Sequence, residues 1–175
     1  MVMNKIDPRS PDPDDSTAYS GTTPSETTVD NLDGSDNVDL SVPSAPWPGS
    51  TYIIRSTSCG RFLSLVDGNV VLAHQNGRSS IRWKCADREG WLGFKNEASG
   101  KWLGYNGDAI RCSAGEHKAR ESFVVRPRPE GGYVLLVTSW ENLWAVGVKR
   151  VKEVETLATI NRGVSRGLIW DFVEV

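Results

Sequence analysis

The stretch Cys59–Leu63 reads Cys-Gly-Arg-Phe-Leu, and Ser99–Leu103, which lies 40 residues later, reads Ser-Gly-Lys-Trp-Leu. Both copies place a small residue, a glycine, a basic residue, an aromatic ring and a leucine in the same order. The offset continues beyond the phrase, since Trp83 falls opposite Phe123. Self-similarity at a period of about 20–50 residues is typical of folds built from repeated supersecondary units. The echo therefore predicts one structural block that is used more than once.

Short β-type runs separated by turn residues follow from Tyr52 onward. Phe62–Val66 and Val70–Leu72 flank Asp67-Gly68, a pair that favours the type I′ turn of a β-hairpin because both residues tolerate positive φ. The second copy is expected to turn at Asn106-Gly107, one residue earlier within the repeat. No 11-residue window shows a convincing helical stripe of apolar residues, so the pattern favours an all-β barrel or sandwich.

A third unit is less regular. Trp140–Trp144 is expected to take the place of Cys59–Leu63, although the glycine is lost. Trp170 closes this unit as Phe123 closed the second, but it follows Phe123 by 47 residues rather than 40. The excess is expected in the loops around Val148–Arg166. Three units of about 40 residues predict threefold pseudosymmetry, because one unit cannot bury its apolar face alone and three can close on a shared core.

The beginning of the chain differs from the rest in composition. Residues 1–46 hold nine acidic and two basic residues, a net charge of −7, and the remainder carries +5. This segment is rich in Asp, Ser, Thr, Pro and Gly, and its few apolar residues cannot bury enough surface to offset the entropy of ordering it. We therefore expect a disordered acidic arm over residues 1–48 and a single domain over residues 49–175.

The sequence shows no recognisable targeting or membrane-spanning segment. No apolar run reaches the roughly 18–20 residues that a membrane-spanning helix needs, and no apolar segment of a secretory signal follows the first charges. Cys59, Cys85 and Cys112 are odd in number, widely spaced and without metal-ligand spacing. Free thiols in a reducing compartment are the simplest interpretation, which predicts a cytoplasmic protein.

Several phrases resemble the repeats of fascin-type β-trefoil domains. They are Tyr52–Ser56, Ser99–Gly104 and Glu121–Phe123, and they are most similar to small, single-domain, fascin-like proteins predicted in filamentous fungi. The resemblance covers residues 49–175 and none of the arm. It implies a β-trefoil, which is a six-stranded barrel capped by three hairpins, and it suggests actin as a partner. Trefoils bind many unrelated ligands, so the resemblance bears on the fold more than on the function.

Catalytic chemistry is not indicated. The sequence lacks nucleophile-elbow, zinc-protease and phosphate-loop motifs. His74 and His117 lie in loop-like stretches and are expected to be exposed. Cys85 and Cys112 fall on apolar repeat positions and are expected to be buried, which leaves Cys59 as the exposed thiol. We therefore expect no enzyme activity, no cofactor and no metal.

Seven tryptophans are many for 175 residues. Trp47, between two prolines, is expected to staple the arm to the barrel, and Trp91, at a strand start, is expected to be half-buried. Trp140 is the best candidate for an exposed binding anchor, since aromatic anchors dominate interface energetics, but core or edge packing is the simpler interpretation of this tryptophan. The predicted core consists of Trp83, Trp102, Trp144, Trp170, Leu63, Leu103, Phe62, Phe123 and Phe172.

Basic residues in the third unit suggest a surface for an acidic partner. Interleaved acidic residues dilute the field of this group, so an ordinary solvated face is the simpler interpretation, and nucleic acid is a weak candidate. The candidate partner-binding residues are Trp140, Lys149, Arg150, Lys152, Arg162 and Arg166.

Two kinds of binding module stay open. The first is a non-enzymatic intracellular interaction module of the fascin-like kind, with actin or another protein as partner; as a monomer with one basic face, it would not bundle filaments. The second is a carbohydrate-binding lectin. Ricin-type trefoils carry a Gln-x-Trp phrase at the end of each unit. The corresponding phrases here are Ile81-Arg82-Trp83, Glu121-Ser122-Phe123 and Leu168-Ile169-Trp170, so Gln is absent from all three. A glycan site would need an aromatic floor with converging Asp or Asn.

Overall fold

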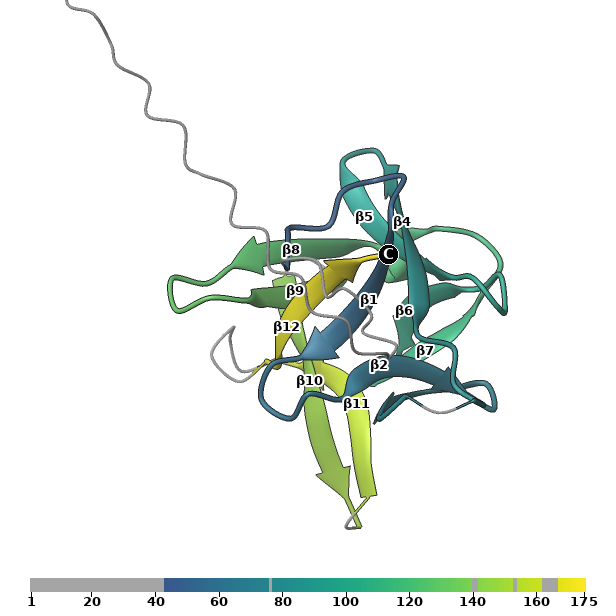
Figure 1. Cartoon of the computed structure of the whole chain (residues 1–175), viewed down its shortest axis with the longest axis vertical. Coiled ribbons are helices and arrows are strands. Elements are labelled where there is room, and N and C mark those ends of the chain that lie inside the picture. The colour runs from purple at the N-terminus through teal and green to yellow at the C-terminus, as the bar shows by residue number, and fades with distance from the viewer. Residues whose placement is uncertain (1–42, 76, 140–141, 153, 162–166) are drawn as a thin grey trace, which may run out of the picture. The chain divides into compact units, whose positions relative to one another are not determined.

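The computed structural model describes residues 43–75, 77–139, 142–152, 154–161 and 167–175, which form an all-β body with one short 3-10 helix (Figure 1). The first unit contains β1 (Thr51–Ser56), β2 (Phe62–Val66), β3 (Asn69–Ala73) and β4 (Arg82–Arg88). The second contains β5 (Trp91–Asn96), β6 (Trp102–Asn106), β7 (Ala109–Ala114), the 3-10 helix η1 (Ala119–Glu121) and β8 (Phe123–Pro127). The third contains β9 (Tyr133–Ser139), β10 (Asn142–Val151), β11 (Val154–Ile160) and β12 (Ile169–Glu174).

Six of these strands close into a barrel. Antiparallel ladders run from β1 to β4, β5, β8, β9 and β12 and return to β1. The pairs β2–β3, β6–β7 and β10–β11 form hairpins, and each is joined to the barrel strand that precedes it. The described strands therefore have the expected arrangement of a barrel with three hairpins, and the β10–β11 hairpin projects furthest from the body (Figure 1).

The ladder registers show the threefold pseudosymmetry directly. Trp83, Phe123 and Trp170 occupy equivalent positions in the three units, and each is at most 1% exposed. Phe94 lies among the rings of the core, with its centroid 5.8 Å from those of both Phe123 and Phe172. Large rings on the strands of each unit thus fill the shared core. The pairs that fix the equivalence are Tyr52–Trp83, Leu92–Phe123 and Tyr133–Trp170.

Most of the predicted core is confirmed, and three rings are not. Phe62, Trp102 and Trp144 are only half-buried. At the start of β2 and β6 the side chain that follows the ring, Leu63 or Leu103, points inward and is buried. Side chains alternate between the two faces of a strand, so the preceding ring faces outward. The confirmed core residues are Trp83, Trp170, Leu63, Leu103, Phe123 and Phe172.

The β2–β3 and β6–β7 turns occupy the same place in their repeats. Asp67 and Gly68 have φ values of 48° and 79°, as the type I′ prediction requires. In the second unit the ladder closes at the pair Asn106–Ala109, so the turn residues are Gly107 and Asp108. The expectation of a turn at Asn106-Gly107 was wrong by one residue, because Asn106 still belongs to the ladder.

The third unit has a different register from the one expected. Phe62 and Trp102 pair with Arg55 and Lys95, and the equivalent pair in the third unit is Leu136–Ala145. Ala145-Val146, rather than Leu143-Trp144, therefore takes the place of the aromatic residue and leucine. The β10–β11 ladder then runs on to the pair Val151–Val154, so part of the excess length lies in a longer hairpin.

The residues before β1 are attached to the barrel by hydrogen bonds from their backbone N–H groups. The N–H group of Ser44 donates to the Phe172 carbonyl oxygen at 3.1 Å, and that of Trp47 donates to the Tyr52 hydroxyl at 2.8 Å. The Trp47 side chain is 75% exposed, so it does not act as the expected staple. The predicted disordered arm lies, up to residue 42, outside the described residues and stays a prediction.

Helical structure in the described part is confined to η1, and no helix there is long and apolar enough to cross a membrane.

Candidate functional site

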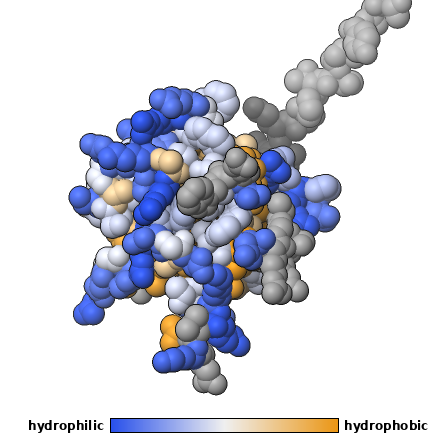
Figure 2. Space-filling view, turned by 180° about the vertical axis from the view of Figure 1, so that it is seen from behind, coloured by the Kyte–Doolittle hydropathy of each residue, from blue (hydrophilic) through white to orange (hydrophobic). Residues whose placement is uncertain are grey.

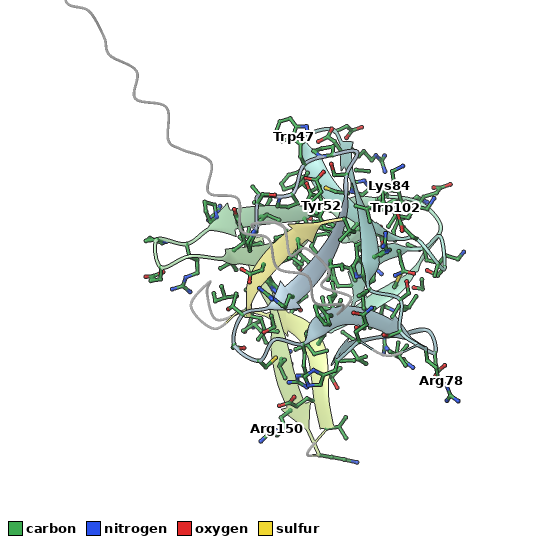
Figure 3. All side chains as sticks on the ribbon, viewed as in Figure 1. Trp47, Tyr52, Arg78, Lys84, Trp102 and Arg150 are labelled. Atoms are coloured by element: carbon green, nitrogen blue, oxygen red, sulfur yellow. The ribbon has the colours of Figure 1, made fainter. Side chains whose placement is uncertain are left out.

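Two of the basic residues predicted to bind a partner form ion pairs with carboxylates of the same chain. Lys149 Nζ lies 2.7 Å from Asp108 Oδ2, and an Arg150 guanidinium nitrogen lies 3.2 Å from Glu155 Oε1. Lys152 is exposed at the tip of the β10–β11 hairpin, and Figure 3 shows Arg150 near that end. Trp140, Arg162 and Arg166 lie outside the described residues. A partner-binding role for this group stays a prediction.

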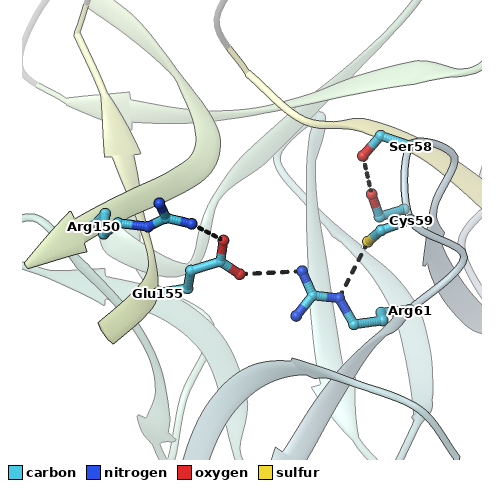
Figure 4. Close-up of polar contacts among 6 residues, drawn as sticks. Ser58, Cys59, Arg61, Arg150 and Glu155 are labelled. Atoms are coloured by element: carbon cyan, nitrogen blue, oxygen red, sulfur yellow. Dashed lines mark hydrogen bonds and ion pairs between the residues drawn. The ribbon is translucent and has the colours of Figure 1, made fainter. Parts of the chain in front are cut away.

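Glu155, which pairs with Arg150, also links the third unit to the first (Figure 4). Glu155 Oε2 accepts from Arg61 at 3.1 Å, and the Nε–H of Arg61 donates to the Cys59 sulfur at 3.3 Å. Partial burial raises the pKa of the Cys59 thiol, but hydrogen bonds from Ser56 and Arg61 and the charge of Arg61 outweigh it and lower the pKa overall. Cys59 is exposed, while Cys85 and Cys112 are buried, as predicted.

A cleft of about 620 Å³ lies where the end of the first unit meets the second and third units, and we call it the Trp91 cleft. Trp91 is 39% exposed there and belongs to the exposed large hydrophobic residues of the described part, whereas half-burial was expected. The other lining residues are mostly polar. They are Arg88, Glu89, Lys118, Ala119, Ser122, Thr138, Asn142 and Leu143.

A tight turn positions Trp91 in this cleft. Arg88 and Trp91 form the last pair of the β4–β5 ladder, with Glu89 and Gly90 between them. These two residues have φ values of 54° and 84°, so the turn is of the type that matches the twist of its strands. The Asp87 carboxylate accepts from the Gly90 N–H at 3.4 Å. The ring is therefore presented by a short, defined hairpin.

A buried histidine, His117, precedes the lining residue Lys118. His117 is 8% exposed, and its ring stacks on Trp102 with centroids 5.0 Å apart and planes at 25°. The ring also lies against Gly93, where an added Cβ would come within 2.7 Å of it. The expectation of an exposed His117 was wrong, because a glycine on β5 leaves room for the ring beneath the loop. His74, in contrast, is exposed as predicted.

Hydrogen bonds tie the His117 loop to the rest of the cleft. The guanidinium of Arg88 donates to the carbonyl oxygen of His117, which joins the β4–β5 hairpin to the loop. Burial lowers the pKa of His117, and the charge of Arg88 lowers it further, although Asp87 acts in the opposite direction. The lowered pKa favours the neutral imidazole at neutral pH, and its Nε2 lies 3.4 Å from the Ser122 hydroxyl oxygen.

The remaining wall comes from the third unit. The Thr138 hydroxyl donates to the Ala119 carbonyl oxygen at 3.1 Å and so fixes the end of β9 against η1. Asn142, at the start of β10, is exposed and lines the cleft with Leu143. An amide side chain both donates and accepts, so Asn142 can bind a hydroxyl group in either role.

Each pair of neighbouring units meets at a junction, and the three junctions are related by the pseudosymmetry. An aromatic residue lines only one of them among the described residues that correspond to Trp91. Trp91 corresponds to Thr51 in the first unit and to Gly132 in the third. The Thr51 hydroxyl donates to Glu97 at 2.8 Å, whereas Gly132 has no side chain. The same backbone hydrogen bond marks all three junctions. It joins Thr138 to Ser122, Glu97 to Arg82 and Thr57 to Ile169.

The sequence did not single out this cleft. Its residues come from four segments between Arg88 and Leu143, and their convergence depends on the stagger of the barrel strands. The local signal was limited to Trp91 beside the turn residues Glu89 and Gly90. Within the part of the chain that the structure describes, no three His, Cys, Asp or Glu side chains are grouped to hold a metal ion.

Comparisons with known proteins bear on the fold. No protein-family model matches the sequence, and no curated protein matches it. A ricin B-like lectin from Macrolepiota procera, solved with lactose, is 10% identical, with a TM-score of 0.57 and coverage of 75% of this chain and 100% of the lectin. The designed threefold-symmetric protein ThreeFoil is 16% identical, with a TM-score of 0.55 and coverage of 71% and 99%.

Two glycosidases contain a similar region. The GlcNAcα1-4Gal-releasing endo-β-galactosidase from Clostridium perfringens is 18% identical, with a TM-score of 0.58 over 72% of this chain. The chain spans 32% of that enzyme's length and 28% of that of a GH43 β-1,3-galactosidase. At these identities the likeness shows the fold alone, and the chain has the β-trefoil fold that the resemblance of its repeats implied. The fascin-like and fungal part of the resemblance stays a prediction.

Proposed function

We propose that this chain is a carbohydrate-binding β-trefoil module that takes one glycan in the Trp91 cleft. The observation that carries the proposal is the half-exposed indole of Trp91, surrounded by Glu89, Asn142 and other hydrogen-bonding groups. One face of a pyranose ring presents C–H groups, and its edge carries hydroxyl groups. An aromatic surface with a few placed polar groups matches both features.

The solved structures support the choice between the two kinds of module. The lectin from Macrolepiota procera was solved with lactose, and another trefoil, SeviL, with the asialo-GM1 saccharide. The actin alternative rests on the resemblance and on the basic residues of the third unit. Two of these, Lys149 and Arg150, already have carboxylate partners. Carbohydrate is therefore the better-supported ligand, and we propose it over actin.

The cleft favours binding without hydrolysis. Glycosidases generally work with two carboxyl groups on either side of the scissile bond. Among the described residues that line the cleft, Glu89 carries a carboxylate and no second acidic residue faces it. The free thiols support the further proposal that the protein works in a reducing compartment such as the cytoplasm.

A glycan array with the full chain tests this function. We expect binding to a limited group of oligosaccharides and a loss of at least about tenfold in affinity for Trp91→Ala, because a buried aromatic anchor contributes about 2 kcal/mol. Trp47→Ala is the matched control, since it removes another exposed indole outside the cleft. Binding that survives Trp91→Ala would contradict the assignment of the site. A chain that binds no glycan but co-sediments with actin filaments would favour the alternative.

A further inference from the structure

A second cleft lies on the outer face of β1, away from Trp91. It has a volume of about 420 Å³, and its apolar lining residues include Ile53, Phe62, Val173 and Val175. Its polar lining residues are Arg55, Gln75, Ser79, Ser80 and Arg82. Val175 is 43% exposed, although it is a large hydrophobic residue. We call this cleft the β1 slot. An apolar concavity of this kind, with a side chain left open to water, is suited to a ligand that brings apolar groups of its own.

The strand register explains the apolar part of the slot. On β1 the residues Tyr52 and Ile54 point into the core, so Ile53 and Arg55 point outward. Across the ladder to β12, Ile53 pairs with Val173, and Arg55 pairs with Asp171, to which it also forms a 2.9 Å ion pair. The floor is therefore an apolar row beside a closed salt bridge.

Recognition at the slot has to use side chains. β1 is paired with β12 on one side and with β4 and β2 on the other, so its backbone offers no free edge to an added strand. Arg82, on β4 opposite Ile53, lies at the slot with its side chain exposed. An occupant with apolar groups on one face and a negative charge nearby would suit this surface.

Such a segment occurs in the same chain, directly before the described residues. Residues 37–42 read Asn-Val-Asp-Leu-Ser-Val, with Val38, Leu40 and Val42 at alternate positions. In an extended conformation these three side chains share one face. Asp39 gives the segment a negative charge that is complementary to Arg82. The segment therefore has both features that the slot requires.

The entry point of the chain places this segment within reach. The N–H group of Ser44 donates to the carbonyl oxygen of Phe172, which is the residue before Val173 in the slot. Six extended residues span up to about 20 Å, several times the ~4.8 Å between neighbouring strands. From Ser44, residues 37–42 can thus cover the slot without any change in the barrel.

We infer that residues 37–42 dock in the β1 slot of their own chain, with Val38, Leu40 and Val42 on its apolar floor and Asp39 toward Arg82. The docked segment covers Ile53 and Val175 and extends the ordered domain upstream of residue 43. This role is independent of glycan binding, because the slot and the Trp91 cleft share no lining residue among those described.

Amide hydrogen exchange of the full chain, read by mass spectrometry, tests the inference. We expect amides 37–42 to exchange more slowly than amides 20–32 of the same molecule, because a segment held against the slot by its side chains is less accessible to water. Leu40→Ser should abolish this difference, and Val175→Asp should reduce it by introducing a charge that repels Asp39. Leu32→Ser is the matched control, because it removes a leucine from the arm outside the docking segment.

Three outcomes would overturn the inference. The first is equal exchange of residues 37–42 and 20–32 in the unaltered chain. The second is protection that persists in Leu40→Ser. The third is protection that rises with protein concentration, because the slot would then be filled by a second copy. Near-UV circular dichroism of each variant shows whether the tryptophan-rich core is intact, so that loss of docking is separated from loss of the fold.

Discussion

At the scale of single residues, His117 anchors the loop that carries Lys118 of the Trp91 cleft. Its ring is held between Trp102 and Gly93, and its carbonyl oxygen accepts from Arg88, which lines the cleft. The sequence around His117 gave no sign of burial, because the space for the ring is made by a glycine more than 20 residues away. A substitution at His117 therefore tests the loop and the cleft together.

The pH dependence of stability should report this burial. The pKa of His117 is lowered from 6.5 in the folded chain, first by burial. The unfolded chain therefore binds the proton first as the pH falls. The contribution of the neutral ring is complete above pH 6.5 and is lost as the pH falls from 6.5 toward the lower folded pKa.

We expect the unaltered chain to lose more stability between about pH 7.5 and about pH 5.5 than His117→Phe, which keeps a ring but cannot be protonated. Urea unfolding at both pH values measures the difference. Equal losses in the two proteins would contradict a lowered His117 pKa.

The three thiols should differ in reactivity. The pKa of Cys59 is lowered overall, whereas burial raises that of Cys85 to about 12 and also raises that of Cys112. Because the thiolate is the reactive form, iodoacetamide should label Cys59 first in the native protein. Arg61→Gln should slow the labelling by removing a positive charge next to the sulfur. Mass spectrometry identifies the labelled residue, and faster labelling of a buried thiol would refute this ranking.

At the scale of elements, the repeat predicted the strands well and the register less well. The Asp67-Gly68 hairpin and the closing residues Trp83, Phe123 and Trp170 follow from the 40-residue echo. The outward orientation of Trp102 does not follow from the repeat, because the size of a side chain does not say which face of its strand points inward. In the third unit Ala145 takes the aromatic position, and a small residue there leaves no pattern to align.

The β4–β5 turn is the element on which the cleft depends most directly. Gly90 has a φ of 84°, a conformation that an L-residue with a Cβ adopts at a cost of about 1 kcal/mol. Gly90→Ala should therefore destabilise the hairpin and weaken binding through a displaced Trp91. Gly115→Ala is the control, because an added Cβ there meets nothing within 4 Å and its backbone is not strained. Thermal unfolding and glycan titration of both variants would show the difference, and equal behaviour would contradict this role for the turn.

At the scale of the whole molecule, the departures from threefold symmetry carry the functional argument. Symmetry accounts for the barrel, the core rings and the shared backbone hydrogen bond of the junctions. It makes no demand on the outer residues, and there Trp91, Thr51 and Gly132 differ completely. The surface behind the view of Figure 1 is largely hydrophilic, with hydrophobic residues in separate patches (Figure 2). Such sites are hard to predict from sequence, because four distant segments must converge before a cleft exists.

The molecule should therefore be monovalent for its glycan. One aromatic junction among three predicts that a monomer binds an oligosaccharide without cross-linking cells or beads that carry it. Agglutination by a protein shown to be monomeric would contradict a single site.

Isothermal titration of the full chain with the strongest oligosaccharide from the array tests the central claim most directly. We expect one glycan bound per chain, with the binding heat lost in Trp91→Ala and retained in Trp47→Ala. Two or three equivalent sites per chain, or an unchanged titration for Trp91→Ala, would contradict the proposal that the Trp91 cleft is the binding site.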